Sequence, residues 1–357
     1  MPRFSFLICL GAIAAAAAVT ARAVPRAGSG VDVTVNESAR RVDVTIGNKP
    51  FTSYIWPSTL KKPVLYPLRT ANGTLVTRGF PLDPRPGERV DHPHHVGLWL
   101  NHGNVNGLDF WNNSDAIPAA QAPKMGTIVH RRIVEATSGA DRGDLVVEMA
   151  WMTPDNKPLL KETTRFVFRG GADSRTIDRI TTLTALDQKV VFKDSKEAFL
   201  GMRLARALEQ PADKPEVFTD ASGRATAVPV LDNKGVTGKY VSSEGKEGDA
   251  VWSTRGKWTL LGGTIGTEPV TVAILDHPSN PGYPTHWHAR GYGLFAANPL
   301  GDKELNEPAA FDFTLEPGKS ATFKYRVLIL SAPPSRDRIE RESDAFAHDG
   351  SPATANR

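Results

Sequence analysis

The feature that most constrains the fold is an alternation of apolar and polar residues with a period of two, which recurs along most of the chain. Val42, Val44 and Ile46, for example, alternate with polar residues. Because successive side chains of a strand point to opposite faces, this pattern is typical of half-buried antiparallel strands. Asn-Gly and Gly-Gly pairs, which favour turns, separate the alternating segments. The pattern is also present over 147–151, 166–168 and 319–330.

Many short strands without interleaved long helices argue against a parallel α/β sheet. The sequence therefore predicts an all-β fold, a large antiparallel β-sandwich of ordinary or supersandwich type. Only the polar segment 335–348 has a helical pattern, which predicts a short C-terminal helix. The predicted organisation is a signal peptide (1–23), a linker (24–34), a single β-sandwich domain (35–332) and a polar helix and tail (333–357).

The N-terminal segment has the pattern of a cleavable secretion signal. Arg3 is followed by the apolar run 4–19, and Ala21 and Ala23 match the small-x-small cleavage motif. We expect the mature protein in the periplasm or outside the cell, without stable membrane insertion. The only cysteine, Cys9, lies inside this segment. Any metal would therefore be bound by His, Asp, Glu, Asn or water.

The charge pattern and the motifs restrict the kinds of partner. The formal net charge is +4, but the basic residues are scattered, which is typical of a solvated surface and not of nucleic-acid binding. The sequence has no glycine-rich phosphate loop and no GxSxG elbow. We expect a small-molecule or glycan substrate, and the oligomeric state stays open.

Histidines gather in two short segments. Of nine histidines, four lie between 92 and 102 and three between 277 and 288. Such clustering is typical of an acid–base or metal site. His286 and His288 would share one face of an extended strand. The predicted catalytic residues are His94, His95, His286, His288 and Glu197.

A metal site is the alternative use of these histidines. His95, His286 and His288 could together bind a divalent zinc, iron or copper ion and leave one position open. A third interpretation gives the histidines only a structural role in fixing loop shape.

Arginines and aromatic residues flank both histidine segments. Arginine binds carboxylates and vicinal hydroxyls, and an aromatic ring packs on the apolar face of a sugar. The alternatives are surface ion pairs for the arginines and ordinary core packing for the aromatic residues. The predicted substrate-binding residues are Arg78, His102, Trp287, Arg290, Tyr292 and Asn298.

Two long motifs resemble a known family. Segments 77–111 (TRGFPLDPRPGERVDHPHHVGLWLNHGNVNGLDFW) and 273–301 (AILDHPSNPGYPTHWHARGYGLFAANPLG) are similar to the hallmarks of a secreted bacterial family of unknown function labelled "methane oxygenase PmoA-like". Segments 194–205 and 251–261 add to this similarity, which spans about residues 35–332. One departure is Val96-Gly97, where the family pattern has Arg-Ser. The resemblance implies export and a β-sandwich fold.

The label itself conflicts with the sequence, since the methane monooxygenase subunit of that name is a multi-helix membrane protein. We expect an exported carbohydrate-processing enzyme of hydrolase, lyase or epimerase type with a histidine-rich acid–base or metal site. One alternative is a carbohydrate-binding protein without catalysis. A further alternative is a metal-dependent oxygenase, as the family label suggests.

Overall fold

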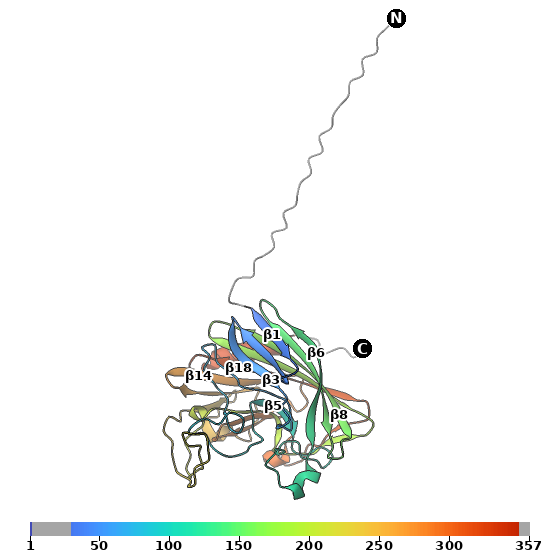
Figure 1. Ribbon diagram of the computed structural model, residues 1–357. Coiled ribbons are helices and arrows are strands. Elements are labelled where there is room, and N and C mark those ends of the chain that lie inside the picture. Colours follow the sequence, from blue (N-terminus) through green and yellow to red (C-terminus); the bar gives the residue numbers. More distant parts are fainter. Residues whose placement is uncertain (2–29, 350–357) are drawn as a thin grey trace.

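The computed structural model describes Met1 and residues 30–349. The predicted signal peptide and most of the predicted linker lie outside these residues. Two eight-stranded antiparallel sheets form most of the described chain (Figure 1). This arrangement confirms the predicted antiparallel all-β fold.

The first sheet has the strand order β1-β2-β3-β4-β5-β11-β16-β15. Its strands are β1 (Val31–Asn36), β2 (Arg41–Ile46), β3 (Lys49–Ile55), β4 (Val64–Leu65), β5 (Leu98–His102), β11 (Ala198–Arg203), β15 (His286–Arg290) and β16 (Leu294–Asn298). Strand β1 begins at Val31, within the segment 24–34 that we predicted to be a linker. The sandwich therefore starts earlier than the sequence indicated.

The second sheet has the strand order β12-β13-β14-β18-β9-β8-β7-β6. Its strands are β6 (Thr127–Thr137), β7 (Gly143–Met152), β8 (Pro158–Gly170), β9 (Ser174–Ala185), β12 (Lys239–Ser242), β13 (Trp258–Ile265), β14 (Glu268–Asp276) and β18 (Ser320–Leu330). Strands β10 (Val190–Phe192) and β17 (Phe313–Leu315) pair separately.

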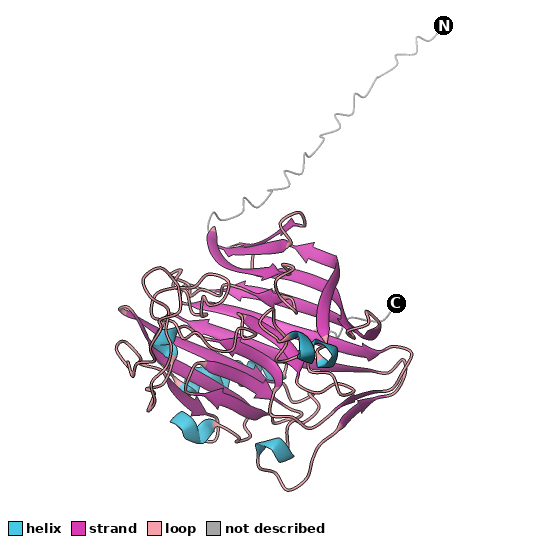
Figure 2. Ribbon diagram, turned by 60° about the horizontal axis from the view of Figure 1, so that its bottom comes forward, coloured by secondary structure: helices cyan, strands magenta, loops and turns pink. Residues whose placement is uncertain are grey.

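Helical segments are short and peripheral (Figure 2). Four are 3₁₀ turns, namely η1 (Ala119–Lys124), η2 (Arg206–Leu208), η3 (Gly248–Val251) and η4 (Lys303–Leu305). The α-helix α1 (Arg336–Ala347) matches the predicted C-terminal helix, and the Ser335 hydroxyl caps it by accepting from the Arg338 N–H. Among the described residues, no helix is long and apolar enough to cross a membrane.

The main core lies between the two sheets, and period-two alternation determines which side chains enter it. Val42, Val44 and Ile46 of β2 are all buried there, as their spacing predicts. Helix α1 covers the outer face of the second sheet, where Ile339 and Phe346 pack with side chains of β13, β14 and β18. The helix is therefore packed on the sandwich, although its sequence is mostly polar.

Candidate functional site

Several of the predicted site residues lie on or above the face of the first sheet that points away from the main core. His288 of β15 lies opposite Ala296 of β16, and Ala296 lies opposite Gly201 of β11. Gly201 in turn lies opposite Trp99 of β5. A Cβ atom on Gly201 would lie 2.5 Å from Cζ2 of Trp99, so the indole lies directly over this glycine. We call this row of four residues, with the loops above it, the site face.

The loop 91–95, called here the histidine loop, covers one end of the site face. The His95 ring is stacked between His92, at 4.8 Å between centroids, and Trp99, at 5.2 Å. Tyr292 stacks on His92 at 5.0 Å. His95 is almost fully buried, and its Nε2 has no hydrogen-bond partner. His92, in contrast, is exposed to solvent.

Two buried arginines anchor the histidine loop. Arg78 donates to the carbonyl oxygens of Asp91 and His92, both at 2.9 Å, and of His95, at 3.2 Å. It also forms an ion pair with the Asp91 carboxylate. Arg203 donates to Oδ1 of the same carboxylate at 2.6 Å, and Nδ1 of His92 lies 2.8 Å from Oδ2. Arg78, which we predicted to bind substrate, therefore contacts the histidine loop with both of its terminal nitrogens.

His288 is held in one tautomer by the segment 194–197, called here the strap. Its Nδ1 lies 2.6 Å from the Lys196 carbonyl oxygen. A carbonyl only accepts, so Nδ1 carries the proton and Nε2 is left as an acceptor. Burial lowers the pKa of His288 to about 4, so the imidazole is neutral at pH 7. Asn298 supports the strap by donating to the Ser195 carbonyl at 2.8 Å.

Glu197 follows Lys196 in the strap and contributes a carboxyl group. Burial raises its pKa, while the charges of Lys196 and His92 act in the opposite direction. His92 and Arg290 influence the pKa of both Glu197 and His288. Glu197 and His288 therefore share two charged neighbours. A carboxyl group with a raised pKa and a neutral imidazole, both held by the same strap, are a combination suited to acid–base chemistry.

The strap is fixed at both of its ends. Asp194 accepts from the main-chain N–H groups of Lys303 and Glu304, both at 3.0 Å, and of Phe311, at 2.8 Å. Gly103 donates its N–H to the Glu197 carbonyl at 2.7 Å.

We predict that Gly103→Ala displaces the strap. The new Cβ would lie 2.9 Å from Cβ of Glu197, which is closer than carbon atoms pack. We expect a loss of about 1–3 kcal/mol in the free energy of unfolding, typical of an overpacked interior. Urea denaturation measures this loss, and near-ultraviolet circular dichroism reports whether the packing of the aromatic side chains changes. A variant as stable as the parent would show that the strap moves freely.

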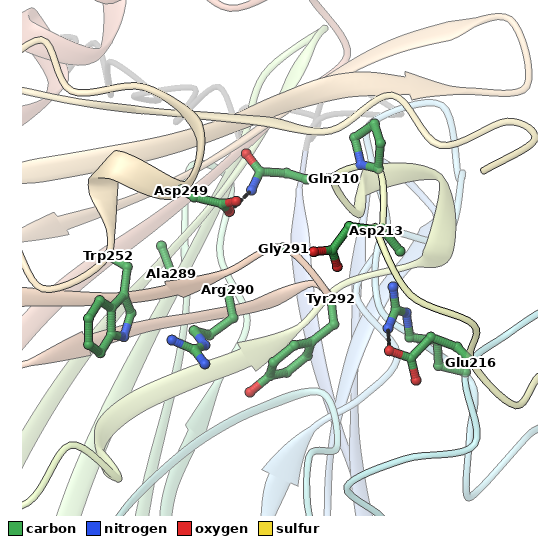
Figure 3. Close-up of a pocket in the computed structure, with 12 residues that line it drawn as sticks. Gln210, Asp213, Glu216, Asp249, Trp252, Ala289, Arg290, Gly291 and Tyr292 are labelled. Atoms are coloured by element: carbon green, nitrogen blue, oxygen red, sulfur yellow. Dashed lines mark hydrogen bonds and ion pairs between the residues drawn. The ribbon is translucent and has the colours of Figure 1, made fainter. Parts of the chain in front are cut away.

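A polar cavity of about 410 Å³ opens beside the site face. Figure 3 shows the side chains of Arg290 and Tyr292 extending to the same side of this cavity. The Arg290 guanidinium lies 5.1 Å from the ring centroid of Trp252. The other lining residues include Arg89, Gln210, Asp213, Glu216 and Asp249. Arg290 and Tyr292 thus belong to the cavity wall. The charge of Arg290 also acts to lower the pKa of Glu197 and of His288, and Tyr292 also stacks on His92.

Two of the predicted substrate-binding residues point into the protein interior. His102 donates from Nε2 to the Lys193 carbonyl at 2.7 Å and packs edge-on against Phe192. Trp287 is buried in the main core, where its Nε1 donates to the Gly256 carbonyl at 3.1 Å. Strand alternation therefore turns both of these predicted substrate-binding residues away from the site face.

His286 shares the site face with His288, as the His-x-His spacing predicts, but has different neighbours. Burial lowers its pKa, and the nearest charges are those of Arg255, Asp302 and Glu307. Its Nε2 is 3.7 Å from Asp302 Oδ1 and 3.6 Å from Glu307 Oε1, too far for hydrogen bonds.

The predicted metal ligands His95, His286 and His288 are not brought together. Within residues 30–349, no three His, Cys, Asp or Glu side chains are grouped closely enough to bind a metal ion. His95 stacks over Trp99 of β5, while the other two lie on β15. Strands β11 and β16 separate β5 from β15, which corresponds to roughly 14 Å at the usual strand spacing.

Several residues of the site were not among those predicted. Asp91 and Arg203 fix the histidine loop, and His92 contacts Tyr292. His92 could have been selected from the sequence, because it belongs to the same DHPHH motif as His94 and His95. Lys62, which donates to the His94 carbonyl at 2.8 Å, has no motif around it that would mark it.

The chain was also compared with known families and structures. The model of a family of unknown function (DUF6807) matches residues 41–344, and none of the curated proteins matches significantly. The methane-oxygenase label is not confirmed by these comparisons.

Several solved structures resemble the chain in the path of the backbone, with little sequence identity. A galactose mutarotase-like protein from Clostridium acetobutylicum is 11% identical with a TM-score of 0.39, over 84% of this chain and 98% of that chain. The aldose epimerase homologue from C. elegans is 10% identical with a TM-score of 0.31, over 86% and 100%. The galactosidase domain of an α-galactosidase-sucrose kinase is 9% identical with a TM-score of 0.40, over 84% and 42%.

Proposed function

Since the chain belongs to a family of unknown function, DUF6807, we propose an activity from the site itself: the protein is an enzyme that acts on a carbohydrate or related polyol. The proposed chemistry is proton transfer by His288 and Glu197. The predicted signal peptide would place this reaction in the periplasm or outside the cell.

The observation that carries the proposal is the fixed tautomer of His288, which is bonded to the strap at Lys196, the residue before Glu197. The hydrogen bond from Nδ1 to the Lys196 carbonyl leaves the lone pair of Nε2 unused. Burial keeps this imidazole neutral, so that it can accept a proton at mildly acidic or neutral pH. Burial also raises the pKa of the Glu197 carboxyl, so that it retains its proton to a higher pH than an exposed glutamate.

Hydrolysis, elimination and epimerisation of a sugar share one requirement. One group must take a proton from a hydroxyl, a water molecule or a C–H bond, and another must give a proton, either to a departing oxygen or, in epimerisation at a C–H carbon, to the other face of that carbon. In the proposed reaction Nε2 of His288 takes the first proton and the Glu197 carboxyl gives the second. A later step returns both groups to their starting protonation states, so the enzyme is unchanged after each turnover.

The groups around this pair suit a polyhydroxylated ligand. Arg290 can donate to vicinal hydroxyls or a carboxylate, and Tyr292 and the exposed His92 carry polar atoms that can hydrogen-bond to a sugar. The adjoining polar cavity of about 410 Å³ is within the size range of small-molecule sites.

A substrate screen tests the proposal. Purified protein is incubated with reducing sugars, glycosides and uronate-containing oligosaccharides, and proton NMR follows the anomeric signals. Each reaction is run with and without a chelator, so that a metal-dependent activity is recognised. Turnover of any of these compounds supports the proposal. Tight binding without turnover would overturn it in favour of a carbohydrate-binding protein.

We predict a bell-shaped pH dependence of kcat/KM with its maximum in the acidic range. The rate should rise as pH increases through about 4, because His288 then loses its proton and becomes a base. It should fall at higher pH as Glu197, whose pKa is raised by burial, loses its proton and ceases to be an acid. A rate that keeps rising from pH 5 to pH 9 would contradict these assigned roles.

A further inference from the structure

A second cavity, of about 510 Å³, lies next to His94. Its wall is mostly apolar and includes Leu60, Val64, Phe80, Leu82 and Val96. The histidine loop is in contact with the walls of both cavities. Its His92 stacks on Tyr292 of the first cavity, and its His94 lines the second.

Lys62 is the buried cation of this second cavity. Its side chain is only 4% exposed, and its Nζ donates to the His94 carbonyl at 2.8 Å. The ammonium group also lies 5.4 Å from the ring centroid of Trp99. Among residues 30–349 no carboxylate lies within 4 Å of Lys62, whereas the neighbouring Lys61 pairs with Asp115 at 2.5 Å.

Asp109, the acid that acts on the pKa of Lys62, accepts hydrogen bonds from other groups. Asp109 raises the pKa of Lys62, but burial has the larger effect and lowers it to about 7. The Asp109 carboxylate accepts instead from the main-chain N–H of Trp111 at 2.8 Å and from Asn112 at 2.9 Å and 2.7 Å. Lys62 is therefore a buried amine without an ionic partner, an arrangement that normally costs stability.

We propose that the second cavity binds a small carboxylate-bearing molecule with an apolar body, and that Lys62 holds its carboxylate. The apolar wall would pack on the body of the ligand, and the carboxylate would supply the missing partner of the amine. His94 offers a second polar contact, because its Nε2 is buried without a hydrogen-bond partner. A cavity of this size is adequate for a molecule such as an aryl or short-chain acid.

Calorimetric titration with benzoate, phenylacetate and hexanoate tests this site. Benzyl alcohol and hexanol, which have the same apolar bodies without the charge, are the matched ligands. We expect at least one acid to bind and its neutral counterpart to bind at least about tenfold more weakly, as a lost charge-assisted hydrogen bond predicts. Equal binding of acid and alcohol, or no binding of any acid, would overturn the proposal.

Two lysine variants locate the carboxylate. Lys62→Met keeps an unbranched side chain, one atom shorter and without the amine, and should weaken acid binding about tenfold or more. Lys189→Met removes a surface cation that pairs with Glu316 outside the cavity and should leave binding within about twofold. Equal losses in both variants would indicate general charge attraction and would overturn the assignment to Lys62.

Two further measurements separate the site from misfolding and from the proposed catalytic groups. Lys62→Met should melt no lower than the parent, since it removes an unpaired buried amine. Leu82→Asp places a negative charge on the cavity wall. This charge repels the ligand carboxylate and should also weaken acid binding. His288→Asn should leave acid binding unchanged, so that failure of this proposal and failure of the proposed activity can be told apart.

Discussion

The variant His288→Asn is expected to lower turnover by about 10²- to 10⁴-fold, the usual contribution of a positioned acid or base. The amide of asparagine can still donate to the Lys196 carbonyl that now accepts from Nδ1 of His288. It offers no acceptor at the position of Nε2. The strap should therefore stay in place while the proposed base is lost. Initial rates and thermal melting of both proteins measure these two effects separately.

His286→Asn is the matched control for this experiment. His286 lies on the same strand and the same face, two residues away, but its charged neighbours are Arg255, Asp302 and Glu307. We expect its turnover to stay close to that of the parent. If both variants lose activity equally, His288 is not the proton acceptor. If neither loses activity, the reaction takes place elsewhere on the molecule.

Asp91→Asn is expected to reduce the free energy of unfolding by about 3–5 kcal/mol, the range found when one partner of a buried ion pair is removed. Arg78 and Arg203, with 1% and 0% of their side chains exposed, would lose their shared carboxylate. Two like charges would then remain in the interior. The histidine loop should lose its fixed position as well, because Arg78 also binds its carbonyl groups. Urea denaturation at pH 7 measures the loss.

The acid dependence of stability provides a second readout of the same group. Burial alone would raise the pKa of Asp91, but Arg203, the hydrogen bond with His92 and Arg78 hold it well below its usual value. The stability from this carboxylate is thus present above the unfolded pKa of about 4 and is lost as pH falls toward the folded pKa.

Asp91→Asn should therefore flatten the acid limb of the stability curve. The control is Asp155→Asn, which removes a surface pair with Lys157 and should change stability little. An Asp91 variant as stable as this control would show that solvent compensates the two arginines.

The class of fold could be predicted from the sequence because strand periodicity is local. The alternating segments at 42–46, 147–151 and 319–330 lie in β2, β7 and β18, and the polar segment near 335–348 forms α1. Neither the pairing order of the strands nor the start of β1 at Val31 followed from the pattern. Both depend on which strands bury each other's apolar faces.

The site could be predicted only in part. The spacing of His286 and His288 correctly placed both on one face of a strand. It did not show that they have different neighbours, because these come from distant segments, such as the strap around Lys196 and the loop with Asp302. His102 and Trp287 resembled site residues because they lie within the same motifs, but a motif does not state which face is the core.

The sequence by itself therefore determined the strands, the histidine-rich segments and the alternation of faces, which are properties of neighbouring residues. Only the tertiary structure decided which face carries the site and which groups are buried. Asp91 meets Arg203 across 112 positions, and His288 meets Lys196 across 92. Protonation and charge pairing depend on burial and on such distant partners. For this reason the ion pairs of Asp91 and the roles proposed for Lys62 and His288 could be inferred only from the tertiary structure.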